Sequence, residues 1–126
     1  MLGQNKKRIL VVDDEEDIVS CLSNLLKRAG YEVMSTTEGA KSLELAESFK
    51  PDLILLDILI PDMEGSEIAS KLSEKPATAN IPIIFLTALI SKKEELSVEK
   101  TGSHYVIAKP TTEKELLGTI NKVLKL

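Results

Sequence analysis

Short apolar runs alternate with longer stretches of mixed polarity along the chain. Most runs are apolar on consecutive residues, which is the pattern of a strand buried on both faces of a sheet. The stretch 31–35 is less apolar than the others, and we therefore expect it at an edge of the sheet. The runs predict strands at 9–12, 31–35, 53–56, 83–86 and 105–107.

The stretches between these runs carry apolar residues at the spacing of an amphipathic helix. Gly30 follows the first stretch as a candidate C-terminal cap, and Thr111 or Thr112 precedes the last one as a candidate N-terminal cap. The stretch 91–101 has only two large apolar residues, so a short or mobile helix is expected there. The predicted helices cover 18–29, 38–49, 66–75, 91–101 and the residues after Thr112.

The alternation of strands and helices predicts an α/β fold with a parallel sheet. We expect a doubly wound, five-stranded parallel sheet flanked by five helices, with no internal repeat or linker. The length of 126 residues fits one compact domain, so residues 1–126 are predicted to be a single domain with no output domain in this chain.

Composition and charge exclude several classes of function. The formal net charge of −4 offers no basic face for a phosphate backbone, so direct nucleic-acid binding is not expected. The one cysteine, Cys21, rules out a disulfide framework, and no Cys/His cluster offers a zinc site. The N-terminus does not resemble a signal peptide, and no stretch approaches the roughly 18 apolar residues of a membrane span. A soluble cytoplasmic domain is therefore expected.

Chemically active side chains follow the predicted strands at the point where each strand ends. In an open parallel sheet, ligands bind at the carboxyl ends of the strands. Asp13 and Asp14 follow the first strand, Asp57 the third, Thr87 the fourth and Lys109 the fifth. We therefore expect three carboxylates, one hydroxyl and one ammonium group at the same edge of the sheet.

Three clustered carboxylates need a counter-cation, because two like charges about 4 Å apart repel by roughly 4 kcal/mol at an effective dielectric near 20. Oxygen ligands favour Mg²⁺ or Mn²⁺ over zinc. A carboxylate nucleophile beside Mg²⁺ is suited to accept a phosphoryl group. Thr87 and Lys109 could then hold phosphoryl oxygens, whereas Asp62 is expected to shape the 61–65 loop and not to touch the metal.

Four motifs together resemble the receiver domain of two-component response regulators, including the chemotaxis receivers. They occur in the family's order and cover essentially the whole chain. This resemblance implies a flavodoxin-like fold with strand order 2-1-3-4-5. The motifs are VVDDEED at 11–17, LLDILIPDMEG at 55–65, IFLTA at 84–88 and AKP at 108–110.

The resemblance implies a role for each residue at the strand ends. Asp57 would be the phosphoacceptor, Asp14 a direct Mg²⁺ ligand, Asp13 a ligand through water, and the backbone carbonyl of Leu59 a third protein ligand. Thr87 and Lys109 would bind the phosphoryl oxygens, in the same way as in the family.

The resemblance also implies the partners of this domain. The donor would be a phosphohistidine on a histidine kinase or phosphotransfer protein. The output surface would be formed by residues 90–100, the fifth strand and the last helix, and would contact a downstream protein or a second copy of the chain. No membrane contact is expected.

One position lacks the family's usual aromatic residue, and two others beside the site are aliphatic. The aromatic residue usual three positions before the lysine is replaced by Val106, while Tyr105 precedes it and should point to the opposite face of the sheet. Beside the site, Leu59 and Leu89 are aliphatic and cannot hydrogen-bond an attacking water, which predicts slow self-dephosphorylation.

Three other functions share the fold or the chemistry of this interpretation. A pseudo-receiver would use it only as an interaction module, but it would have no need for the complete set of site residues. A haloacid-dehalogenase-like phosphohydrolase needs an acid two residues after its nucleophile, where this chain has Leu59. A flavodoxin-like flavin binder needs hydroxyls and N–H donors after the first strand, where the acidic run 13–16 would repel the phosphate.

Overall fold

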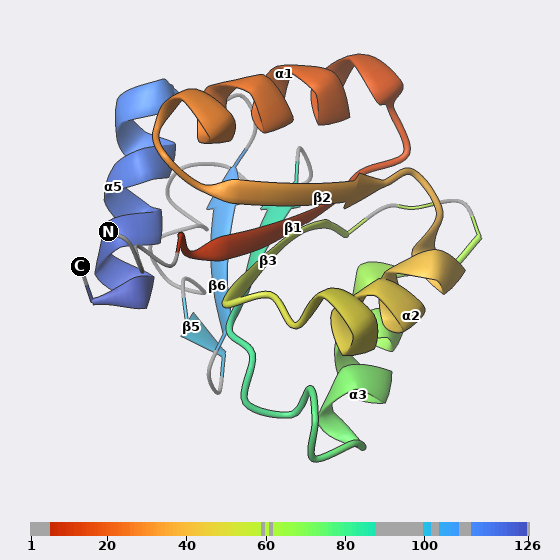
Figure 1. Ribbon diagram of the computed structural model, residues 1–126. Coiled ribbons are helices and arrows are strands. Elements are labelled where there is room, and N and C mark those ends of the chain that lie inside the picture. The colour runs from red at the N-terminus through yellow and green to blue at the C-terminus, as the bar shows by residue number, and fades with distance from the viewer. Residues whose placement is uncertain are drawn as a thin grey trace.

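The structure is a computed structural model that describes residues 6–58, 60, 62–87, 100–101, 104–108 and 112–125 (Figure 1). Strands and helices alternate over most of this length. The elements are β1 (Arg8–Val12), α1 (Glu16–Arg28), β2 (Glu32–Thr36), α2 (Gly39–Phe49), β3 (Leu53–Asp57), α3 (Gly65–Ser73), β4 (Ile83–Thr87), β5 (Lys100–Thr101), β6 (His104–Ala108) and α5 (Glu113–Leu124).

The strands form one sheet in the order β2-β1-β3-β4-β6-β5. All neighbours from β2 to β6 in this order pair in parallel, as the alternation of strands and helices predicts. The least apolar of these strands, β2, lies at an edge of the sheet, which confirms the prediction made from its polarity.

The predicted number of five strands is wrong, because the sheet has a sixth, two-residue strand. This strand, β5, pairs antiparallel with the start of β6. The helix expected over 91–101 therefore does not include Lys100 and Thr101, whose backbone groups instead pair with the edge of the sheet. Residues 91–99 lie outside the described part of the chain, and the described residues form four helices, α1, α2, α3 and α5.

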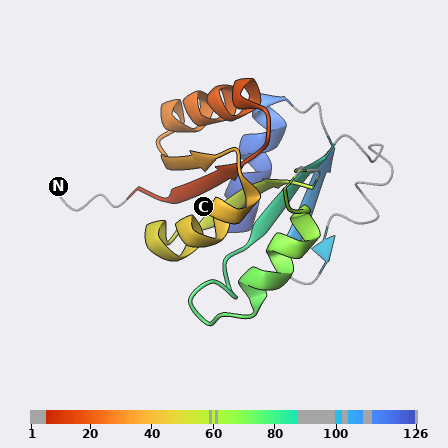
Figure 2. The ribbon, with the colours of Figure 1, turned by 90° about the vertical axis from the view of Figure 1, so that its right-hand side faces the viewer.

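Helices cover both faces of the sheet, with α1 and α5 on one side and α2 and α3 on the other (Figures 1 and 2). Successive residues of a strand point to opposite faces. In β1, Ile9 and Val11 therefore pack in the core beneath α1 and α5, and Leu10 and Val12 pack in the core beneath α2 and α3. Burial on both faces explains why the strands are continuous apolar runs.

The C-terminus of α1 shows how a local sequence signal ends a helix. Gly30 has a φ of 102°, a conformation that glycine adopts without a steric penalty. Its N–H donates to Lys27 O at 3.0 Å, and the N–H of Tyr31 donates to Leu26 O at 3.0 Å. These bonds satisfy two carbonyls at the end of the helix, so the predicted cap at Gly30 is confirmed.

The N-terminus of α5 is capped by Thr112, one of the two threonines considered from the sequence. The hydroxyl of Thr112 accepts from the N–H of Glu115 at 3.0 Å, and the Glu115 carboxylate accepts from the N–H of Thr112 at 3.3 Å. This reciprocal pair is a capping box, which satisfies donors that the first turn of a helix leaves free.

Candidate functional site

Three aspartates gather at the carboxyl edge of the sheet. Asp13 and Asp14 follow β1, and Asp57 is the last residue of the neighbouring strand β3. Val12 lies opposite Leu56, so Asp13 and Asp57, the residues that follow them, lie at the same level of the sheet edge. One carboxylate oxygen from each of the three aspartates lies within 4.8 Å of the other two, as the positions of the strand ends predict.

The three carboxylates differ in their access to water. Asp13 is 1% exposed and Asp57 is 7% exposed, whereas Asp14 is exposed. The N–H of Asp13 donates to Thr36 O at 3.3 Å, and Asp13 Oδ1 accepts from the N–H of Glu15 at 3.0 Å. These bonds hold Asp13 against β2 and the turn into α1, and leave Asp14 on the solvent side of the group.

The segment after Asp57 turns sharply into α3. The N–H of Gly65 donates to Ile58 O at 2.9 Å and closes this turn. A Cβ atom at Gly65 would lie 2.9 Å from Asp57 O and 2.9 Å from Ile58 Cα, which real Cβ atoms do not tolerate. Glycine is therefore required here for close approach of two backbone segments, and this contact fixes the backbone on either side of the Asp57 carbonyl.

Asp62 lies in the same segment and connects it to α2. Its Oδ1 accepts from the N–H of Gly39 at 2.9 Å, and its Oδ2 accepts from the N–H of Ala40 at 3.1 Å. The bond from Gly39, followed by that from Ala40, lowers the pKa of Asp62 below its ordinary value. Asp62 lies outside the group of three aspartates, Asp13, Asp14 and Asp57, whose carboxylates could hold a metal ion.

The contact between Asp62 and α2 could not be seen in the local sequence pattern, because 23 residues separate Asp62 from Gly39. One signal was available. The residue at the N-cap of α2 is Glu38, which is not among the preferred N-caps and makes no side-chain cap bond. A helix without a local cap needs another acceptor for its first N–H groups.

Three predicted site positions fall wholly or partly outside the described residues. These are Leu59, Lys109 and the side chain of Thr87. The backbone of Thr87 is described and ends β4, where it lies opposite Ala108 of β6. The neighbouring residue Leu86 lies opposite Asp57, so β4 ends at the same edge as the acidic group.

The position of Tyr105 agrees with the expected alternation along its strand. Tyr105 is partly buried and packs against the core beneath α1 and α5, on the same face as Ile107. Val106 lies between them in β6, and its side chain is outside the described part of the structure.

The donor set of the acidic group fits a hard divalent cation. Carboxylate oxygens are the ligands that Mg²⁺ and Mn²⁺ prefer, and Mg²⁺ is usually bound by one or two carboxylates together with water. The exposed carboxylate of Asp14 gives such an ion access from solvent, while the buried ones hold a fixed position. The group can therefore hold a cation, which would offset the repulsion among its three charges.

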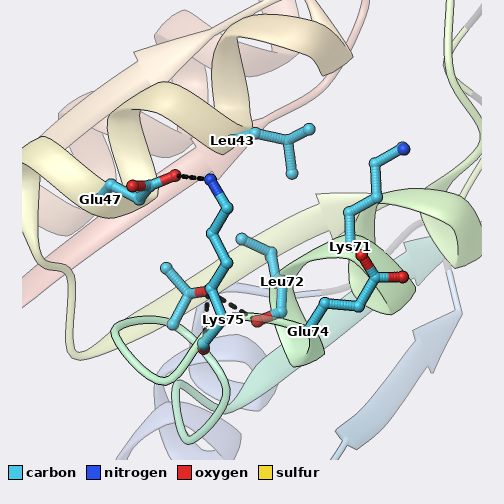
Figure 3. A pocket seen from close by; sticks show the side chains of 7 residues that line it. Leu43, Glu47, Lys71, Leu72, Glu74 and Lys75 are labelled. Atoms are coloured by element: carbon cyan, nitrogen blue, oxygen red, sulfur yellow. Dashed lines mark hydrogen bonds and ion pairs between the residues drawn. The ribbon is translucent and has the colours of Figure 1, made fainter.

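A separate cavity of about 240 Å³ lies between α2 and α3 (Figure 3). The side chains of Leu43 and Leu72 reach into it, and Lys75 crosses from the end of α3 to form an ion pair with Glu47 at 2.7 Å. Both partners are largely exposed, and such pairs contribute little to stability. None of the three aspartates lines this cavity.

Comparison with known proteins gives a consistent result over nearly the whole chain. The family model of the response regulator receiver domain matches residues 9–121. Among curated proteins, the chain is 35% identical to the alkaline phosphatase synthesis transcriptional regulatory protein PhoP of Bacillus subtilis and 33% identical to the DNA-binding dual master transcriptional regulator RpaA of Synechocystis, each over 94% of this chain. It covers 49% of each of these proteins, so it spans about half their length.

Shorter proteins match over nearly their full length. The chain is 32% identical to the polar-differentiation response regulator DivK of Brucella anthropi, over 94% of this chain and 96% of that protein. Among solved structures, the Vibrio cholerae chemotaxis protein CheY4 matches with a TM-score of 0.83 and 28% identity, over 94% of this chain and 99% of that one. The arrangement of sheet and helices is therefore a flavodoxin-like α/β fold of the receiver type.

Proposed function

The chain belongs to the response regulator receiver domain family of two-component signalling, and from this premise we propose that Asp57 is its phosphoacceptor. The donor is a phosphohistidine on a histidine kinase or phosphotransfer protein, the reaction depends on Mg²⁺, and the product changes the protein contacts of the domain. The observation that carries this proposal is the group of three carboxylates within 4.8 Å at the end of β1 and β3.

In the proposed reaction, a carboxylate oxygen of Asp57 attacks the phosphorus atom. The new O–P bond forms as the N–P bond of the phosphohistidine breaks, and the histidine nitrogen leaves with the electron pair. Bound Mg²⁺, or Mn²⁺ in its place, would stabilise negative charge on the phosphoryl oxygens. Asp14 would hold this ion directly, and Asp13 would hold it through water.

Three further residues complete the proposed site. By the family resemblance, the backbone carbonyl of Leu59 is the third protein ligand of the metal ion. Thr87 donates its hydroxyl to one phosphoryl oxygen, and the ammonium group of Lys109 holds another. β4 ends at Thr87, one residue after Leu86, which lies opposite Asp57. This position at the same edge of the sheet supports the proposed role of the threonine.

Intact mass after incubation with Mg²⁺ and acetyl phosphate tests the proposal. We expect the parent protein to gain one phosphoryl group, and we expect no gain for Asp57→Ala or after chelation of the metal. Asp52→Ala is the matched control, because Asp52 precedes the same strand at its opposite end and accepts from the N–H of Arg8 at 2.8 Å. It should gain the phosphoryl group as the parent does.

Two results would contradict this assignment. A gain in Asp57→Ala would place the acceptor elsewhere. No gain by the folded parent in the presence of Mg²⁺ would favour a pseudo-receiver that acts only as an interaction module.

Mg²⁺ should also stabilise the folded protein, because an ion that binds only the folded state shifts the unfolding equilibrium. At a free Mg²⁺ concentration ten times its Kd, the gain in the free energy of unfolding is about 1.4 kcal/mol. Urea unfolding with and without Mg²⁺ measures it. Asp14→Asn should lose most of this gain and Asp52→Asn should keep it; an equal gain in both variants would mean that Mg²⁺ acts at another place.

The output of the domain is proposed to pass through protein contact. The surface would comprise α5, β6 and the 90–100 stretch, of which 90–99 lie outside the described residues, and its partner would be a downstream protein or a second copy of the chain. PhoP and RpaA are named as transcriptional regulators and are about twice as long as this chain, so the absence of direct nucleic-acid contact stays a prediction. Cytoplasmic location is likewise a prediction; within the described ranges, no helix is long and apolar enough to cross a membrane.

A further inference from the structure

Asp62 replaces a local cap at the N-terminus of α2. Its two carboxylate oxygens accept from the N–H groups of Gly39 and Ala40, the first two residues of the helix. Glu38 makes no side-chain cap bond, and the first turn of α2 has no acidic residue of its own. Hydrogen bonds from backbone N–H groups to a carboxylate at this end of a helix are charge-assisted and favoured by the helix dipole.

The contact between the two segments is close as well as charged. A Cβ atom built at Gly39 would lie 3.0 Å from Met63 Cβ and 3.2 Å from Asp62 Oδ1. Met63 also packs against the core beneath α2 and α3. Gly39 therefore lets Asp62 and Met63 lie directly on the start of α2, where Asp62 can reach both N–H groups.

Each side of this contact leads to a different part of the acidic group. On the α2 side, Thr36 Oγ1 accepts from the N–H of Glu38 at 3.1 Å, and Thr36 O accepts from the N–H of Asp13 at 3.3 Å. On the other side, Gly65 is bonded to Ile58 and lies against the carbonyl of Asp57. Asp62 thus connects the segment that holds Asp13 to the segment that carries Asp57.

We propose that Asp62 is a positioning residue that sets the spacing between Asp57 and the Asp13–Asp14 pair and so raises the affinity of the acidic group for Mg²⁺. This inference rests on the proposed function, in which that group binds Mg²⁺. Like charges separate when the backbone allows it. The hydrogen bonds from Gly39 and Ala40 to Asp62 hold the two segments, and so the carboxylates, together before the ion binds. A preorganised site spends less free energy on ordering its ligands when the ion binds.

A simpler role for Asp62 is to stabilise α2 and nothing else. The two roles can be separated at Glu38, which already occupies the N-cap position in an extended conformation. Glu38→Asp would supply a preferred N-cap residue at unchanged charge. In an Asp62→Ala background, this change should restore the stability of α2 without restoring the hydrogen bonds that connect α2 to the segment carrying Asp57.

The experiment measures the Mg²⁺ dissociation constant and the free energy of unfolding for the same set of proteins. We expect Asp62→Ala to weaken Mg²⁺ binding by about three- to tenfold, the size of effect typical of residues that couple two parts of a site. Glu64→Gln is the matched control for charge, because Glu64 lies two residues away and makes no side-chain cap bond to α3. It should bind Mg²⁺ nearly as the parent does.

The double variant Asp62→Ala/Glu38→Asp decides between the roles. We expect it to regain stability but to keep the weakened Mg²⁺ binding. Recovery of both would overturn the proposal, and so would parent-like binding by Asp62→Ala or equal weakening by Glu64→Gln. A parent protein that binds no Mg²⁺ would overturn the proposed function and this inference together, whereas a binding parent with an unaffected Asp62→Ala would overturn the positioning role alone.

Discussion

The phosphorylated protein should lose its phosphoryl group with a half-life of hours, not seconds, as an order of magnitude. Leu59 lies two positions after the acceptor Asp57, and Leu89 lies two positions after Thr87; both leucines are outside the described residues. Neither side chain can accept or donate a hydrogen bond to the water that attacks the acyl phosphate. Loss of such general-base or orienting help slows proton-coupled reactions by about 10²–10⁴-fold.

Intact mass recorded over time after removal of acetyl phosphate, with Mg²⁺ kept present, gives this half-life. Leu59→Gln places a hydrogen-bonding amide beside the acceptor and should shorten it. Leu45→Gln, the same substitution on α2, is the matched control and should leave it unchanged. A half-life of seconds for the parent protein would refute the proposal that the two leucines slow hydrolysis of the acyl phosphate.

The same substitution should have opposite effects on stability at two glycines. At Gly65, the new Cβ of Gly65→Ala would meet backbone atoms of Asp57 and Ile58 at 2.9 Å, and backbone atoms cannot turn away as a flexible side chain can. We expect a loss of about 1–3 kcal/mol in the free energy of unfolding. Because the clash involves the Asp57 carbonyl, Mg²⁺ binding should weaken as well.

At Gly118, on the exposed side of α5, a Cβ would meet nothing within 4 Å. Alanine favours a helix interior more than glycine does, so Gly118→Ala should raise the free energy of unfolding by about 0.5–1 kcal/mol. Urea unfolding of the two variants beside the parent checks both values. Destabilisation of equal size in the two variants would show that close approach at Gly65 is not the cause.

The strands and the acidic group could be predicted because both depend on local pattern. A strand buried on two faces needs a continuous apolar run, and the end of the run locates the next polar residue at the sheet edge. Asp13 and Asp57 were placed in this way, and their carboxylates lie together in the structure. Gly30 was likewise predicted as a helix end from its own residue type.

The features that were missed depend on pairing between distant or weakly patterned segments. The expected helix over 91–101 had too few apolar residues to specify a face, and its last two residues instead pair with β6. Asp62 bonds to residues more than 20 positions away, which no periodicity records. Roles assigned to Leu59, Thr87 and Lys109 come from the family resemblance and stay predictions.

The two edges of the sheet differ in how readily they could pair with a strand of another chain, because the short strand β5 lies at one of them. It pairs with the backbone of His104 and Tyr105 and interrupts the row of groups that a foreign strand would use. At the opposite margin, β2 pairs with β1 alone among the described strands, and its Met34 is 39% exposed. Any templated growth of the sheet, as in early aggregation, is therefore expected at β2, whose one charged residue, Glu32, already forms an ion pair with Arg8 at 3.5 Å.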